Sequence, residues 1–201
     1  MAGFAVNIRH DVFKLRDQLD DFAKRQMPFA TARALTTLAS LAKTDVIAAL
    51  PQRFDRPTPF TQRGPAITVA TKSRLRATVY IKDIQAQYLA LQETGGTRQP
   101  PKQALIVPVD IKLNAYGNIP KGQLAKLKGK PNIFVASVNG IGGFYQRLPG
   151  DKLKLLVRFT PQATYKPRFG YHALVEATVT RNRTAVLRSA LTNALRTATR
   201  P

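Results

Sequence analysis

The 201-residue sequence has no cysteine, no tryptophan and only two histidines, His10 and His172. Without cysteine the chain can form no disulfide, thiolate zinc site or thiol nucleophile, and it is compatible with a reducing cytoplasm. With two histidines a histidine-rich metal site cannot form, and a Ser-His-Asp triad would depend on one of the two. We therefore expect no metal and no cofactor.

Acidic residues are few as well, since 11 Asp and Glu stand against 32 Lys and Arg. The acids are scattered along the chain, and only Asp20 and Asp21 are adjacent. A two-metal nuclease would need several carboxylates that converge from different elements, and nothing in this spacing indicates such a site. We therefore expect that the protein is not an enzyme.

The formal net charge of +21 is unevenly distributed. Residues 1–50 hold seven basic and five acidic residues, whereas residues 51–201 hold 25 basic and six acidic ones, a net charge of +19. A positive field of this size favours a polyanion such as nucleic acid, or an acidic protein surface. The alternative is a basic surface that keeps a self-assembling protein soluble before it assembles.

Long hydrophobic runs are missing too. No stretch approaches the roughly 20 uninterrupted apolar residues that span a bilayer, and residues 1–9 contain no apolar core of a signal peptide. We therefore expect neither membrane insertion nor secretion by a signal peptide, and no membrane partner.

Apolar residues at spacings of three and four predict two helices in residues 1–50, over residues 11–24 and from Pro28 to Leu50, where Pro51 ends the second. Residues 51–65 contain four prolines and predict an extended connector that holds Phe54 and Phe60 against the core. The apolar face predicted for the second helix consists of Ala32, Leu35, Leu38, Ala39, Ala42, Val46 and Leu50.

Residues 66–160 are rich in β-branched residues that alternate with polar ones, a pattern typical of strands. It predicts a hairpin of residues 66–71 and 75–83, a short helix over residues 84–92, an edge strand over residues 104–109, a second hairpin of residues 132–138 and 144–148, and a strand over residues 152–160. A C-terminal helix is expected over residues 171–199. The fold class predicted is α+β: one domain over residues 1–201, with two N-terminal helices and one long C-terminal helix packed on a mostly antiparallel sheet.

The segment "QETGGTRQPPKQALIVPV" combines glycines and basic residues, as phosphate-binding loops do. A Walker-type loop, however, needs G-x-x-x-x-G-K-[ST] between a strand and a helix, and here prolines and a strand follow. The segment instead predicts a turn in which Gly95 or Gly96 takes a positive φ, followed by an extended Pro100-Pro101.

Residues 111–130 hold five lysines, three glycines and no acid, which predicts an exposed loop or short helix that is too polar to bury. Without a helix-turn-helix spacing or an RNA-binding ribonucleoprotein signature, the expected contacts with nucleic acid are to phosphates only. The candidate contacts with DNA or an acidic partner are Lys121, Lys126, Lys128, Lys130, Arg98, Lys102, Arg181, Arg188 and Arg196.

Three stretches carry a resemblance: "AALPQRFDRPTPFTQRG" (48–64), "YLALQETGGTRQPP" (88–101) and "YKPRFGYHALVEATV" (165–179). In their order along the chain they resemble the tail-completion proteins of long-tailed bacteriophages, the minor tail protein Z family and its head–tail joining relatives. None of the three is a catalytic signature. The lysine-dense residues 112–130 depart from the family pattern.

The resemblance implies a structural virion protein, made in the host cytoplasm and located at the head-proximal end of the tail, where it assists head–tail joining. It implies a homo-oligomer, in a ring around the DNA channel, whose partners are other neck and tail proteins such as the tail terminator and the head–tail connector. Non-specific contact with genome DNA is a further expectation. The alternative is a basic protein of the ribosome or nucleoid that binds nucleic acid without reading its sequence.

Overall fold

The computed structural model describes residues 12–100 and 104–198. His10, Lys102 and the predicted element ends at 11, 101 and 199 lie outside these ranges. The described residues form two compact units: unit 1 holds those up to Val46, Pro65–Tyr80 and those from His172 onward, and unit 2 holds Ile47–Gly64 and Ile81–Tyr171. Helices and antiparallel sheets together confirm the α+β class. The single domain expected over residues 1–201 stays a prediction.

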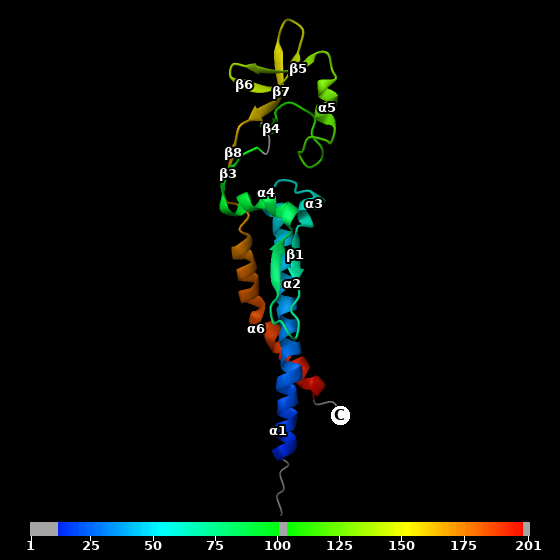
Figure 1. Ribbon diagram of the computed structural model, residues 1–201, viewed down its shortest axis with the longest axis vertical. Helices are drawn as coiled ribbons and strands as arrows, with labels where there is room; N and C mark the ends of the chain where they lie inside the picture. Colours follow the sequence, from blue (N-terminus) through cyan, green and yellow to red (C-terminus); the bar gives the residue numbers. More distant parts are fainter. Residues whose placement is uncertain (1–11, 101–103, 199–201) are drawn as a thin grey trace, which may run out of the picture. The chain divides into compact units, whose positions relative to one another are not determined.

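Helices α1 (Val12–Asp21) and α2 (Met27–Arg53) are joined by a π-helical turn, η1 (Phe22–Gln26), without a loop between them. The predicted separation of two N-terminal helices is thus wrong in detail. Asp21 and Met27 both have α-helical backbone angles, and the Met27 N–H donates to the Phe22 carbonyl. Pro28 follows directly, so its missing N–H falls beside a turn whose hydrogen bonding is already irregular. In Figure 1, α1 continues the line of α2.

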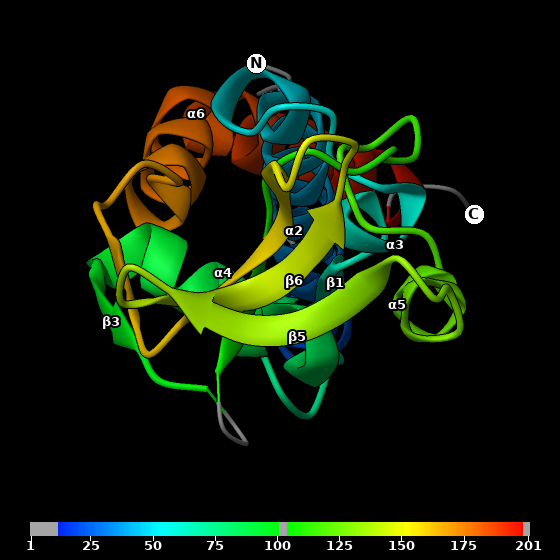
Figure 2. The ribbon, with the colours of Figure 1, turned by 90° about the horizontal axis from the view of Figure 1, so that it is seen from above.

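The alanine-rich face of α2 is buried, as its periodicity predicted. Ala42, Val46 and Leu50 are fully buried, whereas Arg33, Ser40 and other residues on the opposite side are exposed. Small alanine side chains let a neighbouring helix approach closely, and α6 (Tyr171–Ala198) lies beside α2 in unit 1 (Figures 1 and 2).

Helix α2 ends at Arg53 and not at Leu50, because the chain takes up helical hydrogen bonding again after Pro51: the Phe54 N–H donates to the Leu50 carbonyl at 2.9 Å. The predicted extended connector over residues 51–65 is likewise wrong. Residues 51–65 contain the short helix α3 (Pro59–Gln62), and the side chain of its N-cap Thr58 accepts the Thr61 N–H at 3.2 Å. A capping threonine followed by a proline favours a helix start.

The hairpin of β1 (Pro65–Thr68) and β2 (Thr78–Ile81) lies in unit 1 except for its last residue, Ile81, and it confirms the first predicted hairpin with shorter strands. The loop after β1 is tied to α2, because the Ala70 N–H donates to the Thr36 hydroxyl at 3.1 Å.

The larger sheet belongs to unit 2. It consists of β4 (Leu105–Pro108), β7 (Leu153–Thr160), β6 (Ile141–Arg147) and β5 (Ile133–Val138), antiparallel and in the order β4-β7-β6-β5. The four predicted strands are confirmed, and β4 lies at an edge as its proline indicated.

The turn between β5 and β6 is tighter than expected. Asn139 and Gly140 have φ values of 51° and 78°, the pattern of a two-residue type I′ hairpin. Gly143 therefore lies inside β6, where a Cβ would overlap the Val157 carbonyl oxygen of β7. The register of β6 and β7 shifts next to this glycine and leaves Leu156 as a β-bulge.

Helix α5 (Gln123–Lys128) packs against this sheet (Figure 2). Leu127 of α5 is buried in a core with Ile133, Phe144 and Val157. The expectation that residues 111–130 are too polar to bury is thus wrong for Leu127, because a short amphipathic helix can bury its leucines while its lysines face water.

Unit 2 also contains α4 (Asp83–Thr94), which confirms the predicted short helix, and a two-stranded sheet that was not predicted. That sheet pairs β3 (Gly96–Arg98) with β8 (Ala163–Tyr165). Gly95 and Gly96 have φ values of 73° and 119°, so the predicted glycine turn is confirmed.

Candidate functional site

The three stretches that carry the resemblance meet in unit 2, in a cluster that we call the junction. Its centre is Gln92, at the end of α4. The Gln92 carbonyl accepts the N–H groups of Arg168 and Phe169 at 2.8 and 2.9 Å, and its side-chain oxygen accepts the Arg168 Nε–H at 2.7 Å. Gln92 itself is buried, and these three bonds satisfy its oxygen atoms.

Glu93 and Gly95 complete the connection of the second and third stretches. A Glu93 carboxylate oxygen accepts the Tyr171 N–H at 2.7 Å, which places a negative charge at the start of α6, where the helix dipole favours it. Gly95 lies against Pro167, so that a Cβ at Gly95 would come within 2.9 Å of the proline ring. Burial, and the charge of Glu93 to a lesser degree, raise the pKa of the Tyr171 hydroxyl above its ordinary value.

Aromatic contacts join the first stretch to the third. The ring centroid of Phe54 lies 5.4 Å from that of Phe169, which is 2% exposed, and the Arg168 guanidinium lies 4.9 Å from the Phe54 centroid. Phe54 is thus held against the core as expected, whereas Phe60 is 46% exposed and the expectation for it is wrong. The junction is a packed structural element whose polar groups bond to one another.

The candidate lysines lie on α5 and its flanks. Leu124 and Leu127 point to the sheet, so Lys126 and Lys128, one residue to either side of Leu127, lie on the two flanks of the helix. Lys121 precedes α5 and Lys130 follows it, and all four lysines are exposed. We call these four residues the lysine surface.

The lysine surface contains no compensating acid. Most acids in the described ranges are already engaged, in ion pairs such as Asp45 with Arg181 and Asp110 with Lys154, both at 2.7 Å. Among residues 12–100 and 104–198, no ion pair involves any of the four lysines. Their charge is therefore available to an external anion.

The other candidates belong to other parts of the sequence. Arg98 is exposed on β3, and Lys102 lies outside the described residues. Arg181, Arg188 and Arg196 are exposed on α6, but Arg181 is bound to Asp45, and Arg196 donates to the Asn193 side chain at 3.3 Å. Of the cations predicted from the sequence, four therefore gather on and around α5.

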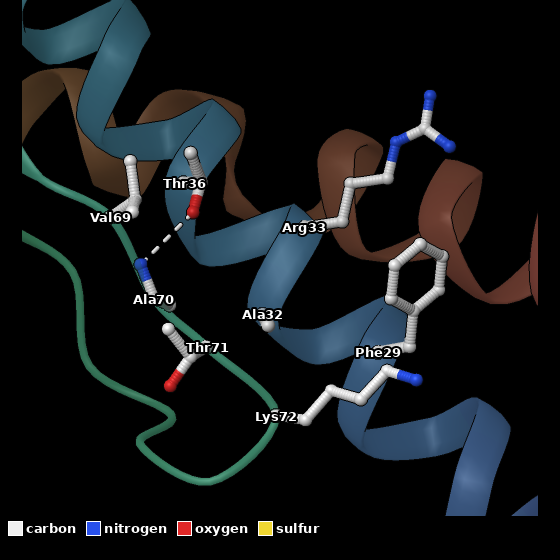
Figure 3. A pocket seen from close by; sticks show the side chains of 8 residues that line it. All are labelled: Phe29, Ala32, Arg33, Thr36, Val69, Ala70, Thr71 and Lys72. Atoms are coloured by element: carbon white, nitrogen blue, oxygen red, sulfur yellow. Dashed lines mark hydrogen bonds between the residues drawn. The ribbon is translucent and has the colours of Figure 1, made fainter.

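A groove in unit 1 was missed by sequence reasoning. It lies between α2 and the loop after β1, has a volume of about 370 Å³, and is lined by Phe29, Ala32, Arg33, Thr36, Val69, Ala70, Thr71 and Lys72 (Figure 3). Phe29 is 48% exposed, and the Lys72 ammonium lies 5.2 Å from its ring centroid. An exposed phenylalanine among alanines is only a weak indication of a groove. The loop that completes the groove is distant in sequence.

In the part of the chain that the structure describes, no three His, Asp or Glu side chains gather as metal ligands, and no helix is long and apolar enough to cross a membrane. Comparisons with protein-family models, curated proteins and solved structures gave no match for this chain.

Proposed function

We propose that the protein is a structural, non-catalytic component of a bacteriophage neck or tail. In this proposal it completes the head-proximal end of the tail and assists head–tail joining as part of an oligomeric ring. The observation that carries the proposal is the junction, because the three stretches that resemble tail-completion proteins form one hydrogen-bonded and aromatic cluster. They therefore act together as a scaffold.

The lysine surface gives the scaffold a binding function. Four exposed lysines on and around a short, anchored helix present positive charge without local acids, which suits phosphates or a carboxylate-rich surface. Lysines contact phosphates without reading bases, so contact with DNA would be independent of its sequence. We propose genome DNA in the channel as the polyanion.

Salt dependence tests the lysine surface. Replacing Lys121, Lys126, Lys128 and Lys130 together by Gln removes four cations while the leucine contacts of α5 stay. If each lysine meets one phosphate, the slope of log K against log salt falls by about 3–4 on duplex DNA. The control replaces four exposed cations elsewhere, Arg53, Arg74, Arg76 and Lys82, and should change the slope less. Equal slopes in the two variants would assign the lysine surface to a protein partner.

The alternative function is that of a cellular protein that binds nucleic acid without sequence preference, and the acid-free lysine surface favours it equally. Deleting the gene separates the two. If the protein completes tails, the deletion should leave DNA-filled heads and unjoined tails in the lysate, and wild-type protein supplied in trans should restore joining. Normal particles from the deletion strain would reject the tail function, whatever the DNA affinity.

A further inference from the structure

Strand β5 is an open edge of the four-stranded sheet in unit 2. It is the last strand in the order β4-β7-β6-β5 (Figure 2). The type I′ turn makes Val138 and Ile141 a hydrogen-bonded pair, so bonding to β6 alternates back along β5 from Val138. The N–H and C=O groups of Val135 and Ser137 therefore point away from the sheet. Within residues 12–100 and 104–198, no turn, loop or side-chain hydrogen bond involves either residue.

The opposite edge, β4, has a protection that β5 lacks. Pro108 of β4 faces outward, because the adjacent Val109 N–H donates inward to the Leu156 carbonyl at 3.0 Å. A proline offers no donor to a further strand, and charged side chains protect sheet edges as well. Strand β5 contains neither a proline nor a charge, and its Val135 is 56% exposed. This edge can therefore accept an extended strand.

The distribution of charge indicates where that strand comes from. Residues 131–146, which include β5, its turn and most of β6, contain no charged side chain, and no other uncharged run in the chain is longer than nine residues. Elsewhere, two copies of a chain with a net charge of +21 repel each other. An acidic partner, in turn, finds no cation within this run to pair with. The occupant that fits is therefore a second copy of β5.

Antiparallel pairing of two β5 strands satisfies the outward groups in one register. With Ala136 on a two-fold axis, Val135 lies opposite the second copy's Ser137, and the two residues exchange N–H···O=C bonds. A shift of two residues in one direction places Ser137 opposite Ile133, whose N–H already donates within its own chain. A shift in the other direction places Val135 opposite Asn139, which has a φ of 51° and belongs to the turn.

We propose that the β5 strands of two copies pair antiparallel about a two-fold axis at Ala136 and join the two four-stranded sheets into one continuous sheet. Alanine, a small residue, then lies where the two strands approach most closely. The exposed Val135 packs beside the second copy's Ser137. The contact is isologous, so it joins the copies in pairs. It deepens the proposed function, on which it rests for the need to oligomerise.

Cysteine cross-linking tests the register, and the sequence has no native cysteine that would interfere. In the proposed pairing the Cα atoms of the two Ala136 residues lie about 4.5 Å apart, within reach of a disulfide, whereas those of the two Ser137 residues lie beyond the limit of about 7 Å. Under mild oxidation, Ala136→Cys should therefore form a disulfide dimer several-fold faster than Ser137→Cys, although Ser137 is the more exposed. With both variants folded by circular dichroism, no dimer from Ala136→Cys, or an equal rate from Ser137→Cys, would overturn the proposal.

A proline at position 137 tests the backbone bonds between the copies and keeps those within the sheet, because the Ser137 N–H points outward. Wild-type protein freed of nucleic acid should approach twice the 22.2 kDa of one chain in sedimentation equilibrium as its concentration rises. Ser137→Pro should weaken this association at least about tenfold, since each copy loses a donor and the proline rings obstruct the pairing. The control is Ile106→Pro on β4, which faces outward as Pro108 does and should leave the association unchanged.

Two results would reject the pairing. One is a wild-type mass that stays at 22.2 kDa up to the highest soluble concentration. The other is a folded Ser137→Pro variant that dimerises as wild type does. Because β5 contains none of the four residues of the lysine surface, either result with an unchanged salt dependence of DNA binding leaves the proposed function standing.

Discussion

Replacing Phe169 by Ala tests whether the junction holds unit 2 together. The side chain is 2% exposed and contacts the rings of Phe54 and Tyr171, with centroids 5.4 and 5.8 Å away. Truncating a buried phenylalanine costs about 3–5 kcal/mol. Loss of two ring pairs favours the upper part of that range. For a chain of this size, each kcal/mol lowers Tm by about 2–4 °C, which gives a fall of about 6–20 °C.

The matched control is Phe60→Ala, in the first stretch of the same junction. Phe60 is 46% exposed, and its backbone carbonyl accepts a hydrogen bond from the Gln85 side chain. An alanine at this position keeps that bond. We expect a loss of about 1 kcal/mol or less. Thermal and urea unfolding, followed by far-ultraviolet circular dichroism, measure both variants. If Phe169→Ala were no less stable than Phe60→Ala, the junction would not be the structural centre described here.

Two further predictions concern stability. Gly143→Ala should lose about 1–3 kcal/mol in urea unfolding, because its Cβ overlaps the Val157 carbonyl. Gly129→Ala should stay within about 0.5 kcal/mol, because Gly129 has a negative φ and its Cβ would make only an ordinary contact, 3.9 Å from the Lys126 carbonyl oxygen. Equal midpoints would contradict the close approach of β6 and β7. Since the folded state raises the pKa of Tyr171, wild-type protein should lose stability as pH rises above the ordinary value of 10.0, and Tyr171→Phe should lose less. A stability difference between wild type and Tyr171→Phe that is constant from pH 9 to about 11 would refute the shift.

Periodicity predicted the parts of the fold in which the spacing of apolar residues along the sequence marks the buried face of one helix or strand. The buried face of α2 follows from apolar residues at helical spacing, and β5, β6 and β7 follow from β-branched alternation. The type I′ turn at Asn139-Gly140 is also a local signal, although the glycines after it suggested a longer turn. These elements are fixed by short-range sequence.

Contacts between distant segments were not predictable in the same way. The pairing of Gly96 with Tyr165 joins strands of three residues each, too short to give a pattern. Leu127 is buried because it packs into the core of the sheet, although its neighbours in the sequence are polar. The groove beside Phe29 depends on the hydrogen bond between Ala70 and Thr36, which are 34 residues apart.

The candidate site likewise has features that were predictable from local sequence and features that depend on distant segments. Exposure of the four lysines was predictable, because a stretch with five lysines and no acid has no local partner. The engagement of Arg181 with Asp45 was not, since 136 residues separate the two. The meeting of the three resembling stretches at Gln92 likewise required the structure.

We propose that this chain is a structural part of a phage neck or tail. An electron-microscopic reconstruction of phage particles from cells that express this chain tests this proposal. We expect several copies in a ring at the head-proximal end of the tail, with the lysine surface towards the DNA channel. Particles that join heads to tails without this chain would contradict it.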